Sequence, residues 1–290
     1  MNGILYDADG GQQILASPVK VTLQRSVSAP ADVLEAVFPL TGPVRPAAFF
    51  RMAAAGKVLF DGPVDTMRET DGRLLHLSVR SRAALLLDSQ ALPGTWLHPG
   101  LRNLFQTYAV PYGFTQIVGD MRVFDTPYTI DSNKSEWQAL DTFCQSFLGT
   151  ALWEENGVLR AEQPTFSEPA VLGKSGIPYL KVCRTWQMYR QLSEVWGIRS
   201  GELENCIQDS AVRQTGILRR RISAAPEAAL QEACGQVQTT SVLCVGWQPV
   251  KLWQPAVLWL PQETLQLQVK QILYQLSTEG KTTRLLLQNG

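Results

Sequence analysis

Histidine is scarce in this chain of 290 residues, which contains only His76 and His98. A catalytic triad or a metal site that needs two histidines therefore has little to draw on. The positions of the two, on the polar face of a predicted strand and in the loop TWLHPG, favour surface or loop roles. The five cysteines are an odd number without a CxxC pair, which indicates reduced thiols rather than a disulfide framework or a zinc site. We expect no catalytic, cofactor-binding or metal-binding residues.

Net charge and long apolar runs are also lacking. The 26 basic residues cancel the 26 acidic ones, which excludes the broad field of a general nucleic-acid or anionic-membrane binder. No window approaches the roughly 18 consecutive apolar residues of a membrane span, and the first residues lack the features of a secretory signal. We therefore expect a protein kept in the cytoplasm unless something carries it out, with neither membrane nor sequence-specific nucleic acid among its partners.

The clearest pattern that is present is a strand, turn and strand at residues 58–81. Val58 and Phe60 alternate with polar or exposed positions, Gly62-Pro63 bends the chain, and Asp71-Gly72 marks a tight turn. After that turn, polar residues alternate with the apolar Leu75, Leu77 and Val79. This pattern predicts a hairpin with one buried face.

An echo of this hairpin closes the chain at residues 265–288, with a turn at Glu279-Gly280. The alternation changes phase between Val269 and Ile272, where one extra residue predicts a β-bulge. The two hairpins together suggest a duplicated β module.

Residues 4–89 have the alternation of an antiparallel β module, in which 29–38 (APADVLEAVF) is expected to form a short helix or an irregular crossing. Pro39, Pro43 and Pro46 break whatever precedes them. The alternation stops in residues 81–94, which indicates a domain boundary.

A small α+β domain is predicted next. Helices are expected at 101–108 and 135–148, the second opened by a capping box of either Asn133 with Glu136 or Ser135 with Gln138. Gly149 is well placed to end that helix, and Asn156-Gly157 favours a type I′ hairpin.

Residues 164–178 have the proline and glycine content of a linker. Strands are expected at 180–200, 217–222 and 241–247, with a helix at 226–237. The predicted fold is α+β and mainly β, with two similar small antiparallel β-barrels and α+β insertions. Its expected domains are a first barrel at 1–89, an α+β domain at 90–165, a second barrel at 166–222 and 262–290, and a helix-containing insertion at 223–261.

Three clusters have the composition of a binding or catalytic site. Trp247, Trp253 and Trp259 recur every six residues between prolines, where they could stack on sugar rings or pin irregular chain onto a core. The second cluster consists of Asp61, Asp65, Glu69 and Asp71. These residues could supply a carboxylate pair for glycoside hydrolysis, although carboxylates around a turn are usually solvated. The third, Arg219–Arg221, suits phosphate or an ion-paired interface.

The order of these parts resembles that of the baseplate hub, or late control D-like, proteins of contractile-tailed phages, Mu-like phages and tailocins. Three stretches carry the resemblance across nearly the whole chain: residues 58–89, from VLFDGPVD to LLLDS, residues 136–159, EWQALDTFCQSFLGTALWEENGVL, and residues 267–288, LQVKQILYQLSTEGKTTRLLLQ. The proline-rich stretch 39–46 departs from the family pattern.

The resemblance implies a non-enzymatic homotrimer in which two β-barrels per subunit alternate around a ring, so that three chains imitate six-fold symmetry. Such a ring joins the tail tube, or a tube-initiator protein, to the central spike protein, and a LysM-containing baseplate protein is a further expected neighbour. It also implies a place in the tail baseplate of a virion or phage-tail-like particle, assembled in the bacterial host cytoplasm. Two alternatives remain: a carbohydrate-binding β protein that uses the tryptophans, and a cell-wall hydrolase component of the tail tip that uses the acidic turn.

Overall fold

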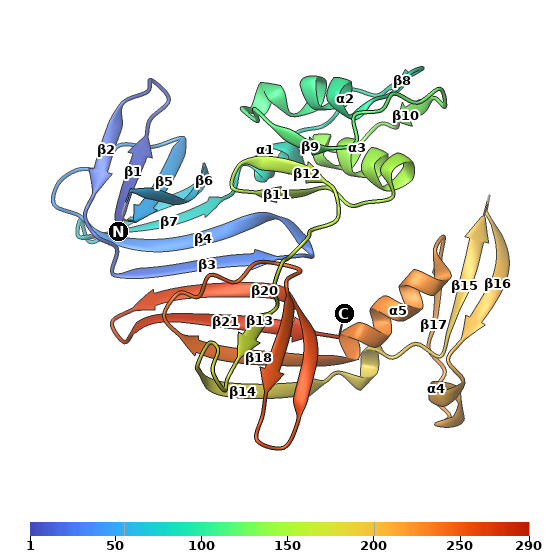
Figure 1. The fold of residues 1–290 in the computed structure, drawn as a ribbon. Coiled ribbons are helices and arrows are strands. Elements are labelled where there is room, and N and C mark those ends of the chain that lie inside the picture. The colour runs from blue at the N-terminus through green and yellow to red at the C-terminus, as the bar shows by residue number, and fades with distance from the viewer. Residues whose placement is uncertain (55, 200, 290) are drawn as a thin grey trace. The chain divides into compact units, whose positions relative to one another are not determined.

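The computed structural model describes residues 1–54, 56–199 and 201–289 (Figure 1). The chain divides into two compact units: Met1–Thr165 with Leu273–Lys281, and Phe166–Ile272 with Thr282–Gly290. The fold is α+β and mainly β, with antiparallel strands dominant, as the sequence predicts. Among the helices in the described ranges, none combines the length and the apolar character needed to cross a bilayer.

The sheet of the first unit contains the first seven strands of the chain, which pair antiparallel in the order β3-β4-β7-β6-β5-β1-β2. In chain order they are β1 (Asn2–Tyr6), β2 (Gln12–Leu15), β3 (Lys20–Ser26), β4 (Ala29–Pro39), β5 (Phe49–Ala54), β6 (Lys57–Thr70) and β7 (Leu74–Arg80). The buried rings of Phe38 and Phe50 pack edge to face in its core, with centroids 5.7 Å apart.

The predicted opening hairpin is confirmed as β6 and β7. Its turn residues Asp71 and Gly72 have φ of 52° and 63°, as a type I′ turn requires. β6 leaves β5 for β7 after Pro63, and close to this point a Cβ on Gly62 would lie 1.9 Å from the Arg80 carbonyl oxygen, so only glycine fits this approach. Val58 departs from the prediction, with 54% of its surface exposed, because a bulge shifts the β5–β6 register between Phe60 and Val58.

Residues 29–38 form neither a helix nor an irregular crossing, because they lie in β4. This strand is held between β3 and β7, and its alternate residues Leu34, Ala36 and Phe38 are buried. Ala31, three residues before Leu34, is buried in the core cluster that contains the helices. Pairing on both sides overrides the weak helical character of the sequence.

The rest of the first unit contains α1 (Ala83–Asp88), α2 (Leu101–Tyr108) and α3 (Glu136–Phe143), with a 3-10 turn at Val110–Tyr112 and a π-helical turn at Cys144–Leu148. Two short sheets accompany them, one of β8 (Gly94–Trp96) and β10 (Tyr128–Ile130), the other of β9 (Ile117–Gly119), β11 (Trp153–Glu155) and β12 (Val158–Ala161). The core between them is aromatic, since the ring of Phe143 stacks on Phe147 with centroids 4.9 Å apart, and Tyr128 contacts both edge to face.

The local predictions for this region are confirmed. α2 has the predicted bounds, and α3 opens with the capping box of Ser135 and Gln138. Gly149, with φ of 68°, ends the π-helical turn, and Asn156-Gly157 has the left-handed φ of a type I′ turn.

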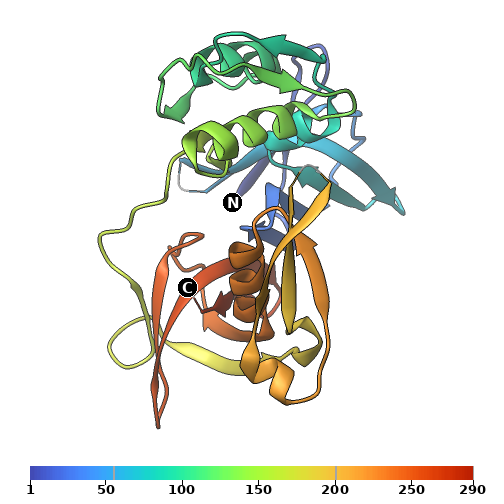
Figure 2. The same ribbon diagram turned by 90° about the vertical axis from the view of Figure 1, so that its right-hand side faces the viewer.

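The main sheet of the second unit has the strand order β14-β18-β21-β20, continued by β19 and β13. Its strands are β13 (Ala170–Leu172), β14 (Tyr179–Trp186), β18 (Gln238–Val245), β19 (Pro255–Trp259), β20 (Thr264–Ser277) and β21 (Gly280–Gln288). Residues 187–237 form a separate small sheet, β16-β15-β17, made of β15 (Glu194–Arg199), β16 (Glu202–Gln208) and β17 (Arg220–Ser223). The helix α5 (Pro226–Val237) packs on it through Leu192, Val195 and Ala233, while α4 (Ser210–Gln214) follows β16 (Figure 2).

The helix α5 and the closing hairpin form as predicted, except that the hairpin turn is at residues 278–279 and Gly280 already opens β21. Val269 and Ile272 are both buried, in agreement with the predicted change of phase. The expected strand at 180–200 is two strands, β14 and β15, with a 3-10 turn between them, and Ser200 lies outside the described residues. The predicted linker 164–178 contains β13, whose pairing with β19 was not visible in the sequence.

Candidate interaction surfaces

The three tryptophans of the repeated series are part-buried and are not a row of open platforms. The ring of Trp259 accepts a cation–π contact from the Lys174 ammonium, 4.1 Å from its centroid. Its carbonyl oxygen accepts a hydrogen bond from the Tyr179 hydroxyl at 3.0 Å. Trp253, at a φ of 60°, donates its backbone N–H to the Val269 carbonyl at 2.8 Å. This arrangement suits pinning of the loops around β19 and does not favour sugar stacking.

The acidic residues of the opening hairpin act as ion-pair partners. Asp61 lies 3.5 Å from both Arg51 and Arg82, and Asp65 is bound by Arg80. Glu69 and Asp71 lie further along, at the opposite end of β6 and in its turn. With the first two carboxylates neutralised by arginines, the hairpin does not present the acid and base pair of a glycosidase.

Arg80 ties three elements together at the end of β7. Its guanidinium donates to both oxygens of Asp65 on β6, at 2.7 and 2.9 Å, and to both oxygens of Asp88 on α1, at 3.2 and 2.6 Å. These hydrogen bonds raise the pKa of Arg80 above its already high ordinary value. The residue therefore fixes α1 against the β6–β7 hairpin.

A second polar cluster joins β4, the end of β7 and β11. The Ser81 hydroxyl donates to Glu154 Oε2 at 2.7 Å and accepts the Asp32 backbone N–H at 3.2 Å. Glu154 also accepts backbone N–H bonds from Ala83 and Gly157. The Asp32 carboxylate lies 3.0 Å from Arg25 Nε, yet burial raises the pKa of Asp32 to about 7.

Neither Asp32 nor Glu154 was singled out in the sequence. Ser81 lies 49 residues from Asp32 and 73 from Glu154, so no local spacing could have connected them.

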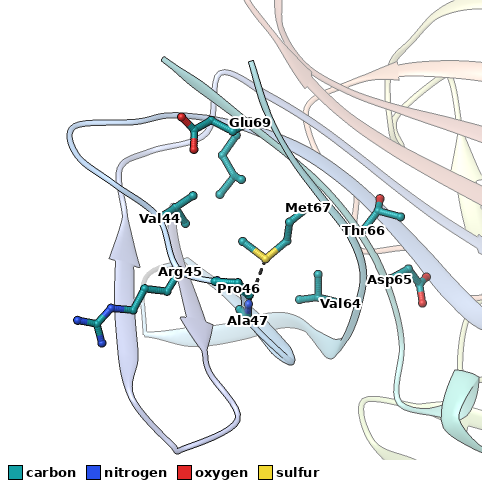
Figure 3. Close-up of a pocket in the computed structure, with 10 residues that line it drawn as sticks. Val44, Arg45, Pro46, Ala47, Val64, Asp65, Thr66, Met67 and Glu69 are labelled. Carbon is teal, nitrogen blue, oxygen red and sulfur yellow. Dashed lines mark hydrogen bonds between the residues drawn. The ribbon is translucent and has the colours of Figure 1, made fainter. Parts of the chain in front are cut away.

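Pro39 ends β4, and the rest of the proline-rich stretch, residues 40–46, has no regular structure and is held in part by side-chain contacts. Gln13 on β2 accepts the Arg45 N–H at 3.2 Å and donates to the Pro43 carbonyl at 3.1 Å. Next to it, the Ala47 N–H points at the Met67 sulfur at 3.2 Å (Figure 3). A cavity of about 350 Å³ remains between residues 44–47 and β6. Val64 and Met67 give it an apolar wall, which suits packing.

The remaining candidates from the sequence are scattered. Arg220 is paired with the buried Glu194, and Arg219 donates to the Met188 carbonyl at 2.7 Å. His76 is part-buried on β7, while His98 is exposed, with its Nδ1 3.6 Å from Asp125. In the part of the chain that the structure describes, no group of three or more histidine, cysteine or acidic side chains is placed to hold a metal.

Two strand edges offer pairing capacity instead. β14 ends the sheet order of the second unit, and only β18 pairs with it in the described ranges. On β6, residues 66–70 pair with β7 on one side, since β5 covers only the first half of the strand. An exposed edge with free N–H and C=O groups is a ready site for another strand.

Comparison with known proteins places this fold among tail proteins. The sequence matches no family model and no curated protein. Among solved structures, the 43 kDa tail protein of prophage MuSo2 from Shewanella oneidensis superposes with a TM-score of 0.78 at 14% identity, covering 100% of this chain and 98% of that one. The tail protein from Neisseria meningitidis MC58 gives 0.72 at 18% identity, covering 99% and 96%.

A more distant likeness is to the E. coli c3393 protein, described as a type VI secretion component structurally similar to the T4 tail proteins gp27 and gp5. It gives a TM-score of 0.57 at 5% identity, covering 93% of this chain and 73% of that one. The chain therefore has the fold of these phage tail proteins.

Proposed function

We propose that the chain is a structural, non-enzymatic baseplate hub protein of a phage tail or phage-tail-like particle. The observation that carries the proposal is the likeness to two tail proteins over nearly the full length of each chain. The ion-paired carboxylates of the hairpin and the part-buried tryptophans fit a protein built for packing better than they fit a hydrolase or a sugar binder.

The hub we propose contains two similar barrel-like modules. In support, the four strands β3-β4-β7-β6 of the first unit and β14-β18-β21-β20 of the second occur in the same order. β6 and β20 each have 14 residues and lead through a short turn into β7 and β21. The repeated strand order is what an internal duplication would leave.

We keep residues 1–89 as the first module and 90–165 as an α+β domain. The second module comprises the main sheet of the second unit. Its insertion, predicted at 223–261, is now proposed to begin directly after β14, because β15, β16, β17 and α5 form their own small sheet and core.

We propose further that three chains form a ring of six modules. This ring would join the tail tube, or a tube-initiator protein, to the central spike protein, with a LysM-containing baseplate protein as a further neighbour, and it would assemble in the bacterial host cytoplasm. The likeness to a protein described as structurally similar to the T4 tail proteins gp27 and gp5 supports a place in the tail.

Light scattering of the purified full chain at micromolar concentration, together with electron microscopy of particles, tests this function. A homotrimer and a three-fold ring with pseudo-six-fold features at the baseplate are expected. A chain that stays monomeric, in particles that lack such a ring, would overturn the proposal.

A further inference from the structure

The edge of β14 is long and poorly covered. Most of its residues are exposed, and the exposed apolar side chains include Leu180, at 62%, and Trp186, at 56%. Lys181 and Cys183 are also exposed, and Cys183 carries a free thiol. Proteins usually protect such an edge, since it invites pairing with another chain. Nothing in the described part of this chain pairs with the outer side of β14.

The second half of β6 is the complementary feature. Residues 66–70 pair with β7 alone, and Thr66, Arg68 and Glu69 are exposed. Thr66 and Arg68 lie opposite Ser78 and His76, whereas Glu69 lies opposite the buried Leu75. By strand alternation, Thr66 and Arg68 therefore belong to the outer face of the sheet, and Glu69 belongs to the other face.

The pairing of β3 in the first unit indicates which kind of strand could pair with the edge of β14. β3 has the place in β3-β4-β7-β6 that β14 has in β14-β18-β21-β20. The neighbour of β3 is β20, whose end, from Leu273 onward, belongs to this same unit. Counted from the first residue of each 14-residue strand, residues 273–277 of β20 correspond to residues 66–70 of β6.

We infer that β14 of one copy pairs edge to edge with residues 66–70 of β6 in a second copy, a contact that rests on the proposed oligomeric hub. In this contact, β6 of the second copy would lie beside β14 in the way that β20 lies beside β3.

This contact joins two different surfaces, so each copy offers one edge and accepts one. Heterologous contacts of this kind close into rings when the rotation between copies allows it. Pairing of up to five residues would also satisfy backbone groups that are otherwise left to solvent, and it would cover the apolar side chains of β14.

The natural thiol of Cys183 allows a direct test in the full-length chain. Cys183 lies opposite Ser241 on β18, whereas its neighbour Val182 lies opposite the buried Val242, so Cys183 is on the outer face. Thr66→Cys and Arg68→Cys are made separately, with Cys206 and Cys234 replaced by serine to remove competing thiols. Under mild oxidation, we expect at least one of these variants to form intermolecular disulfides about ten-fold faster than the Glu69→Cys variant, because a disulfide needs adjacent Cβ atoms on one face.

Glu69→Cys is the matched control, since this residue is as exposed as its neighbours but points to the opposite face. Intermolecular bands that require both Cys183 and position 66 or 68, and that disappear in the Cys183→Ser background, support the pairing. A trimer by light scattering without such bands overturns the strand pairing and leaves the hub function intact. A chain that is monomeric at every concentration overturns the strand pairing, and it overturns the hub function as well if the particles also lack the three-fold ring.

Discussion

Asp32 is expected to make the folded chain less stable as the pH rises from about 5 to about 8. Burial raises the pKa of this carboxyl from 3.8 to about 7, while Arg25 opposes the shift and Glu154 adds to it. The native carboxyl therefore holds its proton more tightly than the unfolded one. The resulting stabilisation is present at low pH and is lost as the pH climbs through about 7.

The size of the effect follows from the span of the titration. At pH 5, about two units below the native pKa, Asp32 can raise the free energy of unfolding relative to pH 8 by at most about 2.7 kcal/mol, at about 1.36 kcal/mol per pKa unit. The Asp32 side chain keeps 26% of its surface exposed and lies 3.0 Å from Arg25. We therefore expect about half of the bound, roughly 1.3 kcal/mol, because solvent screens the group.

Urea unfolding followed by tryptophan fluorescence at about pH 5 and pH 8 measures this contribution in the wild type and in Asp32→Asn. All other groups titrate in both proteins, so the difference between their pH dependences belongs to Asp32. Asp9→Asn, at an exposed carboxylate, is the matched control and should keep the wild-type dependence. Equal pH dependence in all three proteins would refute the reasoning. A wild type that gains stability at pH 8 relative to Asp32→Asn would mean that the ion pair with Arg25 outweighs burial.

Three substitutions test the packing of the first unit by the same unfolding assay. Gly62→Ala should lower the free energy of unfolding by about 3 kcal/mol, because the added Cβ would collide with the Arg80 carbonyl. Gly42→Ala is the control and should cost little, since no atom lies within 4 Å of its added Cβ. Equal effects of the two substitutions would contradict the close approach at Gly62. Ser135→Ala removes the capping box of α3 and should cost about 1 kcal/mol, and an unchanged urea midpoint would argue against the cap. Arg80→Lys should cost about 1 kcal/mol because an ammonium cannot reproduce the bidentate contact with Asp65, so a neutral result would show that the contact contributes nothing.

The elements that the sequence predicts well are those encoded within a few residues. The turn at Asp71-Gly72 needs two residues that tolerate left-handed φ, and the capping box needs a serine three residues before a glutamine. Each signal is complete within one turn of chain, so distant structure has little chance to override it. The same holds for α5, which starts at the predicted proline.

The features that the sequence missed depend on partners far along the chain. β4 is a strand because β3 and β7 flank it, and seven residues of β4 are in register with residues of β7 more than 30 positions away. The Asp32 cluster likewise joins residues separated by 49 and 73 positions. Local propensity contains no information about such pairings, which are selected by burial in the assembled sheet.

The proposed duplication also explains where the two modules differ. A two-residue turn after Ser26 joins β3 to β4, whereas residues 187–237, with their own sheet, helix and core, join β14 to β18. In the proposed duplication, β3 and β4 correspond to β14 and β18, so the two connections join corresponding strands. Despite its long connection, β14 still pairs with β18 from Tyr179 to Trp186. Lengthening a surface connection costs little loop entropy, because that cost grows only with the logarithm of its length. A repeated sheet can therefore keep one pairing order while its loops diverge, so contacts common to both modules belong to the strand edges and contacts peculiar to one module belong to its loops.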